Sequence, residues 1–329
     1  MAIKLFVDAT ADLQSKFLRE HPEIVVIDTP IIVNSKTDSM QFDNLTPDDF
    51  QHIDRDYSPK KGYRITTSSP TILDPDLEIE GSVATLAYQA VKAGYAVLYL
   101  AMGSGMSGTY FHAKLCFDEL REEYLIPKYQ LQAVDSRCMS TGTAMLVNEL
   151  YENFDFEALN DVAPVVDYIE KHRDHIMHFF TWTNLDYIVK SGRVSAIKGA
   201  TAKFLRLLPI GAAVYTGEDM RALETVTSLN SPRNLNRFAD IVGEYIERHL
   251  VTPDSPITVA YANNPDAGYY LAMLLGSRLP RAQIIDGYRL SSAIQAHGGP
   301  TSLHVNFHAD VTPTLEEMTA EISQIISAL

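Results

Sequence analysis

Residues 96–110 read AVLYLAMGSGMSGTY, and this stretch decides the predicted fold. Its first six residues, Ala96–Ala101, are all apolar or aromatic and predict a buried strand. The segment Thr109–Glu123 predicts a helix, and the glycine-rich turn Gly103–Gly108 joins the two. A strand that leads through such a turn into a helix is typical of a parallel α/β sheet, whose ligands bind beyond the carboxyl ends of the strands.

The same alternation extends through the first half of the chain. Strands are predicted at Lys4–Val7, Ile24–Ile27, Ala96–Ala101 and Gln130–Val134, and helices at Asp12–Arg19, Ser82–Ala93 and Thr109–Glu123. Because strand–helix–strand units with apolar strands build parallel sheets covered on both faces, we predict a mainly parallel, Rossmann-like α/β domain over residues 1–158.

The pattern changes after a linker at Asn153–Asn160 and a helix at Asp161–His172. The predicted strands are Phe179–Thr183, Ala212–Tyr215, Ile257–Tyr261, Ile284–Asp286 and Leu303–Phe307, separated by longer helical segments. Apolar residues at helical spacing predict an amphipathic helix over Thr314–Leu329. Residues 159–329 are therefore expected to form an α+β domain with an extra C-terminal helix.

Composition and charge narrow the function classes. The 329 residues include 27 Lys and Arg against 42 Asp and Glu, a net charge of −15, which disfavours nucleic acid and an anionic membrane surface as partners. Cys116 and Cys138 have no metal-binding or redox spacing and are expected to be small buried groups. The N-terminus has no apolar signal core, and the longest apolar-looking stretch, Phe204–Tyr215, contains Arg206 and Pro209. We expect a cytoplasmic protein with no stable membrane insertion.

The glycine-rich turn allows three interpretations. Gly103, Gly105 and Gly108 satisfy G-x-G-x-x-G, the dinucleotide fingerprint, so a nucleotide-dependent oxidoreductase is the alternative function. The acid that could bind the ribose, Asp135, comes later than that fingerprint expects. The hydroxyls of the turn, on Ser104, Ser107 and Thr109, suit a small anion such as a carboxylate at a helix N-terminus. We favour the anion site; a purely structural turn is the third possibility.

A serine hydrolase is a further alternative, with Ser104 or Ser107 as nucleophile, His297 as base and Asp135 as the orienting acid. Neither serine has glycines at both −2 and +2, as the G-x-S-x-G elbow requires. The register therefore disfavours this alternative.

Three other segments carry candidate residues. The hydroxyl run Thr66–Thr71 is either a polar loop or a ligand contact, and His297 lies on a predicted glycine-rich loop, where most histidines are simply solvated. The positive segment from Lys190 to Arg206 is either a solvated face or a surface for an anionic ligand or an acidic partner. His172, His175 and His178 recur every three residues, a spacing that turns the third side chain away from the first two on a helix, so no metal site is expected.

Six segments, in order along the chain, resemble motifs of the DegV family of bacterial fatty-acid-binding proteins. They are Asp8–Leu13, similar to D-S-T-A-D-L; Thr67–Thr71, similar to T-S-Q-P-S; Gly103–Tyr110, similar to S-S-G-L-S-G-T-Y; Val134–Ser136; Leu185–Ser195, similar to L-x-Y-L-x-x-G-G-R-I-S; and Ala296–Pro300, similar to A-H-T-G-P-G. The resemblance runs from Asp8 to about Phe307 and so covers most of the chain.

The resemblance implies two α/β domains with a long-chain fatty acid in a tunnel at their junction. Thr67 and Ser104 would hold its carboxylate, with His297 nearby and Arg193 at the positive end. Supporting contacts would come from the residues that flank these in the same motifs: Ser68, Gly105, Ser107, Gly108 and Thr109.

The family resemblance also implies a partner, a separate fatty acid kinase that phosphorylates the carboxylate to an acyl phosphate. The chain would then be a carrier with no catalytic site, cofactor or metal of its own, and it contains no Walker-type phosphate loop. It departs from the family pattern at Gly103, Ser69 and Leu208, and its basic segment is thinned to Met220–Glu224. If those basic positions contact the kinase in the family, their loss here weakens the expectation of a kinase partner but does not affect the expectation of lipid binding.

Overall fold

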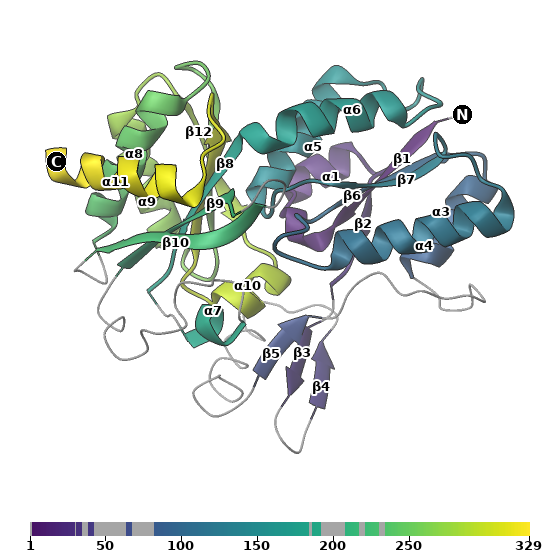
Figure 1. The fold of residues 1–329 in the computed structure, drawn as a ribbon, viewed down its shortest axis with the longest axis horizontal. Helices are drawn as coiled ribbons and strands as arrows, with labels where there is room; N and C mark the ends of the chain where they lie inside the picture. The colour runs from purple at the N-terminus through teal and green to yellow at the C-terminus, as the bar shows by residue number, and fades with distance from the viewer. Residues whose placement is uncertain are drawn as a thin grey trace.

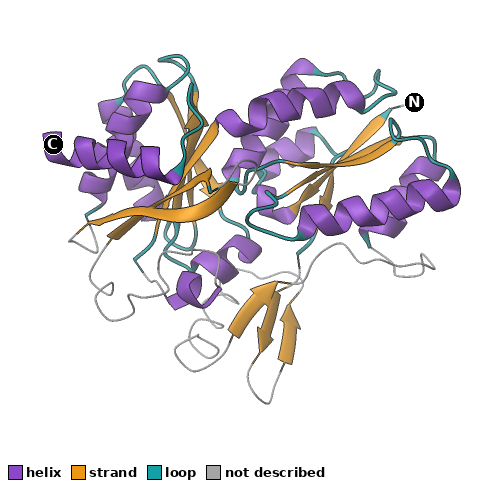
Figure 2. Ribbon diagram, viewed as in Figure 1, coloured by secondary structure: helices purple, strands orange, loops and turns teal. Residues whose placement is uncertain are grey.

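Two sheets lie side by side with helices around them, and a small third sheet lies at the bottom of the view (Figures 1 and 2). The structure is a computed structural model that describes residues 2–29, 31–34, 39–42, 64–67, 82–183, 186–191, 208–216, 221–229 and 234–329.

The first half contains the predicted strand–helix–strand units together with three strands and a helix that were not predicted. In chain order the elements are β1 (Ile3–Asp8), α1 (Ser15–Glu20), β2 (Val25–Ile27), β3 (Ile31–Asn34), β4 (Ser39–Phe42), β5 (Arg64–Thr67), α3 (Val83–Lys92), β6 (Ala96–Ala101), α4 (Thr109–Tyr124), β7 (Leu131–Asp135), α5 (Thr141–Asn153) and α6 (Ala163–His172).

The second half is a mixture of strands and helices. It contains β8 (Ile176–Thr181), α7 (Asp186–Ser191), β9 (Leu208–Tyr215), β10 (Arg221–Leu229), α8 (Leu235–His249), β11 (Pro256–Tyr261), α9 (Pro265–Arg278), β12 (Gln283–Arg289), α10 (Ser292–Gly298), β13 (Leu303–His308) and α11 (Leu315–Ala328).

The first sheet is fully parallel, in the order β2-β1-β6-β7. Every residue of β6 is buried, because α3 and α4 cover one face of the sheet while α5 and α6 cover the other. This arrangement confirms the predicted Rossmann-like sheet, and it brings the carboxyl ends of β1, β6 and β7 to one edge.

The second sheet has the order β10-β9-β8-β13-β11-β12 and is antiparallel except for the pair β11 and β12. Helices α8, α9 and α11 cover its outer face, where Phe179, Phe238 and Phe307 belong to the largest apolar cluster. The mixed α/β character of this half is as predicted, although β10 and its place at the sheet edge were not.

Helix α5 lies between the two sheets and was not predicted. Leu146 and Val147 pack into the core of the first sheet, while Ala144 joins the cluster that includes Phe180 of the second. A hydrogen bond of 3.0 Å between the hydroxyls of Thr258 and Thr141 also links this helix to β11.

Helix α6 follows the expected domain boundary at residues 158 and 159, yet its buried side chains Val165, Val166 and Ile169 pack with the first sheet. Ile3 donates its N–H to the Phe156 carbonyl at 2.8 Å, so the expected linker is also paired with β1.

The third sheet, in the order β4-β3-β5, is antiparallel and was not predicted. Its strand β5 lies against α7 and α10 (Figure 1). The prediction that His297 lies on a loop is wrong, because residues 292–298 form α10. Ser291 caps this helix by accepting the N–H of Ile294, and Gly299, at φ +83°, ends it.

Within the described ranges, none of the helices is both long and apolar enough to cross a bilayer. The same residues include no cluster of three or more His, Cys, Asp or Glu side chains suited to a metal ion. His172, His175 and His178 lie on three different elements: the end of α6, a short 3-10 turn and β8. Cys116 and Cys138 are buried free thiols, as predicted.

Candidate functional site

A cavity of about 480 Å³ lies at the junction of the two sheets, at the carboxyl edge of the first. This volume falls within the ~300–1,000 Å³ typical of small-molecule sites. One wall comes from the loops that follow β1 and β6, the other from β8, β10 and β13, and helices α7 and α10 complete it. The cavity therefore occupies the place that the sequence analysis gave to a ligand tunnel.

The turn after β6 shapes the first wall. Gly103 donates its N–H to the Cys138 carbonyl at 2.8 Å, and a Cβ at this glycine would lie 3.0 Å from the Arg137 carbonyl carbon. Only glycine fits such a close approach of two backbones without a shift. Ser104 lines the cavity half-buried, and its hydroxyl has no hydrogen-bond partner among the described residues.

The remaining polar groups of the turn are partly paired with one another. The Ser107 and Thr109 hydroxyls are 2.8 Å apart, and Ser107 Oγ also accepts the Thr109 N–H at 3.3 Å. Ser104 donates its N–H to Asp135 Oδ1 at 3.0 Å. Met106 and Ser107 also donate their N–H groups to the Gly103 carbonyl, at 2.9 and 3.1 Å. The three hydroxyl residues thus line the cavity, but most backbone N–H groups of the turn already have partners.

Two buried carboxyls at the end of β1 belong to the same region, and the sequence analysis did not name them as site residues. Asp8 lines the cavity and accepts hydrogen bonds from the Tyr99 hydroxyl and, at 2.6 Å, from the Met102 N–H. Burial raises the pKa of Asp8 to about 6, although both hydrogen bonds oppose the rise. An acid at the end of a buried strand, at the carboxyl edge of a parallel sheet, is the signal that identifies Asp8.

Asp12 ties the first wall to α10. Its carboxylate accepts the Ser140 hydroxyl at 2.5 Å and the Ser291 N–H at 2.7 Å. Burial raises the pKa of Asp12 to about 7 against these two hydrogen bonds. Because Ser291 begins α10, this single side chain fixes the helix that carries His297 relative to the first sheet.

The second wall is mostly apolar. Phe180 and Leu223 come from the second sheet, Trp182 directly follows β8, and Ile188 and Ile294 come from the flanking helices. Methionines from the first half, Met102, Met106 and Met139, extend the apolar surface across the junction. No Lys or Arg lines the cavity within the part of the chain that the structure describes.

The predicted site residues fall into three groups. Ser104, Ser107, Gly108, Thr109 and His297 all line the cavity. Gly105 belongs to the same turn, and the backbone of Thr67 ends β5, the strand that lies against α10. Ser68 and Arg193 lie outside the described residues.

The two enzyme alternatives find no support in this geometry. Asp135, the acid nominated in both, accepts the backbone N–H groups of Ser104 and, at 2.9 Å, of Arg137. Asp135 Oδ1 therefore holds the backbone of two turns together. An apolar cavity with hydroxyls along one wall is suited to binding an amphipathic acid.

Comparisons with known proteins agree on one family. A family model described as "Uncharacterised protein, DegV family" matches residues 2–309. A DegV domain-containing protein from Clostridium perfringens is 25% identical over 221 residues, which are 67% of this chain and 72% of that protein.

Solved structures share the fold. A stearic acid-binding protein from Eubacterium ventriosum superposes with a TM-score of 0.72 at 19% identity, over 93% of this chain and 98% of the other. A fatty acid binding DegV family protein from Streptococcus agalactiae gives a TM-score of 0.69 at 22% identity, over 94% and 100% of the two chains. At these identities the likeness establishes the two-part α/β architecture.

Proposed function

Because the chain belongs to the DegV family, we propose that it binds a long-chain fatty acid in the cavity at the junction of its two sheets. The observation that carries the proposal is the division of the cavity wall. Three hydroxyl residues gather at the turn after β6, while Phe180, Trp182, Leu223 and the methionines supply much of the apolar surface. An acid with a hydrocarbon tail matches both parts.

The tail supplies most of the binding free energy in this proposal. An acyl chain of roughly sixteen carbons, at ~0.8 kcal/mol per buried methylene, contributes on the order of 10 kcal/mol before ordering costs. A hydrogen bond to a hydroxyl contributes only ~1 kcal/mol net, and somewhat more when the acceptor is charged. Affinity therefore comes from the apolar wall and orientation from the polar one.

We assign the carboxylate to the polar wall. Ser104 supports this, because its hydroxyl lacks a partner among the described residues and faces the cavity. Thr67, His297 and Arg193 complete the proposed head-group site, with further contacts from Ser68, Gly105, Ser107, Gly108 and Thr109.

In this proposal the protein is a cytoplasmic carrier that does no chemistry itself and presents the carboxylate to a fatty acid kinase. Hydroxyls hold a carboxylate without the fixed salt bridge that would enclose it, which leaves the head group available to a second protein. A test is acyl phosphate formation by a purified fatty acid kinase with ATP and the loaded protein. We expect Ser104→Ala and Thr67→Ala to slow acyl phosphate formation more than they weaken fatty acid binding. A wild-type rate of phosphorylation in both variants would remove these residues from the head-group role.

Native mass spectrometry of the intact protein tests the ligand directly. We expect the purified chain to carry, or to take up from a stearic acid solution, a single molecule of fatty-acid mass. A protein that stays free of ligand after incubation with long-chain acids contradicts the proposal.

Two glycine substitutions test whether the tail occupies this cavity. A Cβ at Gly211 would overlap the ring of Phe180, which lines the cavity, so Gly211→Ala must displace that ring and change the shape of the cavity. We expect it to weaken stearic acid binding about tenfold or more, and a shorter acid less. Gly276→Ala is the matched control, because Gly276 lies on α9 and does not line the cavity. A Cβ at this position would meet only Ile284 Cγ1, at 3.6 Å. Equal affinities for the two variants would place the tail elsewhere.

A further inference from the structure

Two histidines of the second sheet pack against each other, and one of them interrupts the apolar wall of the cavity. His178 on β8 and His304 on β13 pack edge to face, with ring centroids 4.9 Å apart and planes at 70°. Both are almost completely buried. His304 lines the cavity, whereas His178 is not among the described residues that do.

The His304 ring has no hydrogen-bond partner in the part of the chain that the structure describes. Neither of its nitrogens makes a hydrogen bond to any described residue. Nδ1 is fully buried, whereas Nε2 is not, so Nε2 is the nitrogen that a ligand in the cavity can reach. Its neighbours across the sheet are Phe180 on one side and Ala260 on the other, and neither side chain can supply a hydrogen bond. An unpaired buried polar group is costly, so such groups in folded proteins usually meet a ligand or an ordered water.

The chemistry of the ring limits what it can meet. Burial lowers the pKa of His304 to about 3, so the imidazole is neutral at physiological pH. A neutral imidazole offers one N–H donor and one nitrogen acceptor, which matches a hydroxyl or a carbonyl oxygen. It lacks the positive charge that would attract a carboxylate, and it stands on the sheet that faces the Ser104 turn across the cavity.

We propose that His304 forms a second polar subsite, which hydrogen-bonds an oxygen carried on the hydrocarbon chain, and that the preferred ligands are hydroxy or oxo fatty acids. The inference rests on the proposed function: if the carboxylate binds at the Ser104 turn, the part of the ligand that contacts His304 is its hydrocarbon chain. A cavity built to pair with a hydroxyl discriminates against the analogue that lacks it, since the imidazole then stays unpaired.

The test compares stearic acid with three hydroxystearic acids whose hydroxyl lies near the carboxyl end, at mid-chain or near the methyl end. Dissociation constants come from displacement of a fluorescent fatty acid from the wild-type protein. We expect at least one positional isomer to bind about tenfold tighter than stearic acid. If all three bind no tighter than stearic acid, a water molecule satisfies the ring and the inference is wrong.

Substitutions assign the preference to the ring. We compare the dissociation constant of stearic acid with that of the preferred hydroxystearic acid. We expect His304→Leu to bring the ratio of these two constants toward one, while His304→Gln, which keeps a donor and an acceptor, retains part of the preference. His178→Leu is the matched control and keeps the wild-type ratio, because that ring does not line the described cavity. A His304→Leu protein that melts like the wild type and keeps the ratio contradicts the role of His304.

The failure of this inference is distinct from failure of the proposed function. Stearic acid that binds with no preference for any hydroxylated isomer overturns only the His304 subsite. A protein that binds neither stearic acid nor the hydroxystearic acids overturns both.

Discussion

Asp12 shows how one residue can organise a site that it does not line. It follows the 3-10 turn Ala9–Ala11 and is left-handed, at φ 51° and ψ 39°. Its carboxylate holds Ser140, whose φ of 52° and ψ of −140° lie in a region that costs a side-chain-bearing residue roughly 1–3 kcal/mol. Met139, the preceding residue, lines the cavity. Asp12 thus stabilises a strained turn that places part of the cavity wall.

The raised pKa of Asp12 predicts how stability changes with pH. An ordinary aspartate has a pKa of 3.8, and burial raises that of Asp12 to about 7 in the folded protein. Between about pH 4 and pH 7 the folded chain therefore binds more protons than the unfolded one, and this group's contribution to stability is lost as pH rises. Asp8, with a pKa raised to about 6 by burial, acts in the same direction.

Asp12→Asn removes the ionisation and keeps the shape of the side chain. We expect the variant to gain stability relative to wild type as pH rises from 5 to 7.5, by on the order of a few kcal/mol. Urea unfolding of both proteins at each pH measures the difference. Asp118→Asn, at a partly exposed ion pair with Lys114, is the control and should show no such gain. If the free energies of unfolding of Asp12→Asn and wild type differ by the same amount at every pH, Asp12 does not titrate in this range.

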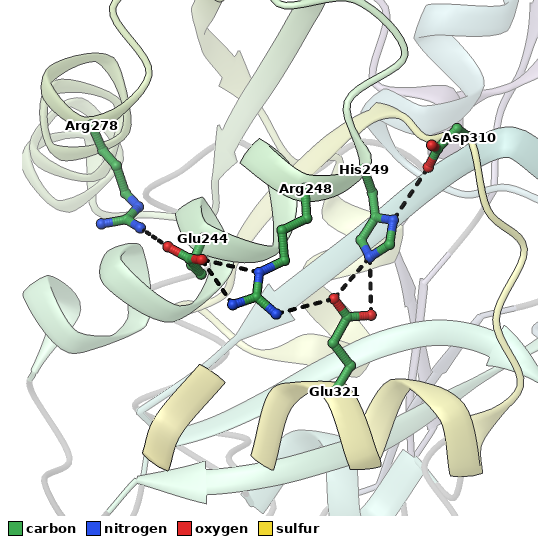
Figure 3. Close-up of polar contacts among 6 residues, drawn as sticks. All are labelled: Glu244, Arg248, His249, Arg278, Asp310 and Glu321. Atoms are coloured by element: carbon green, nitrogen blue, oxygen red, sulfur yellow. Dashed lines mark hydrogen bonds and ion pairs between the residues drawn. The ribbon is translucent and has the colours of Figure 1, made fainter. Parts of the chain in front are cut away.

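At the scale of elements, polar contacts join the helices on the outer face of the second sheet. Glu321 of α11 pairs with His249 Nε2 at 2.9 Å and with Arg248 Nη1 at 3.6 Å, both at the end of α8 (Figure 3). Arg248 also pairs with Glu244 at 2.9 Å, and Glu244 contacts Arg278 of α9. The network complements the apolar packing of Met318, Ile322 and Ile325 beneath it.

We expect Glu321→Gln to lower the free energy of unfolding by about 1 kcal/mol, because a partly exposed network is stronger than a single surface pair. The loss should shrink at high salt, where charges are screened. Chemical denaturation at low and high salt measures both effects. Glu316→Gln, on an exposed position of the same helix, should have a smaller effect at either salt concentration. A loss that does not depend on salt would assign Glu321 a packing role.

The sequence predicted an element correctly where its local pattern was simple. β6 and α4 were found within a residue of their observed ends, because one is wholly apolar and the other begins directly after a glycine-rich turn. α5 was missed because its sequence, TGTAMLVNELYEN, combines a buried Gly142 and two threonines with residues that face both sheets. A helix buried on two sides shows no single apolar stripe.

At the scale of the molecule, α5 makes the two sheets one cooperative unit. It supplies apolar residues to the core of the first sheet, while Thr141 receives hydrogen bonds from Thr258 and Asn306 of the second. Neither sheet can unfold alone without exposing a buried face of this helix. The cavity depends on the same junction, so ligand binding should stabilise both halves together.

Unfolding followed by two probes tests this cooperativity. Trp182, the single tryptophan of the chain, is buried next to the second sheet, whereas far-UV circular dichroism reports on all helices and strands. We expect both signals to change with the same denaturation midpoint. A tryptophan transition that precedes the loss of secondary structure would show that the second half unfolds independently.

The sequence by itself determined the parallel sheet, its carboxyl edge and the hydroxyl-rich turn at that edge. These features are local: apolar runs, helical spacing and glycines fall within a few residues of one another. The tertiary structure decided which distant groups meet there, including the helical position of His297, the bridge from Asp12 to Ser291 and the approach of His304. Asp12 and Ser291 are 279 positions apart, and no local pattern carries information about a contact that depends on how two sheets pack.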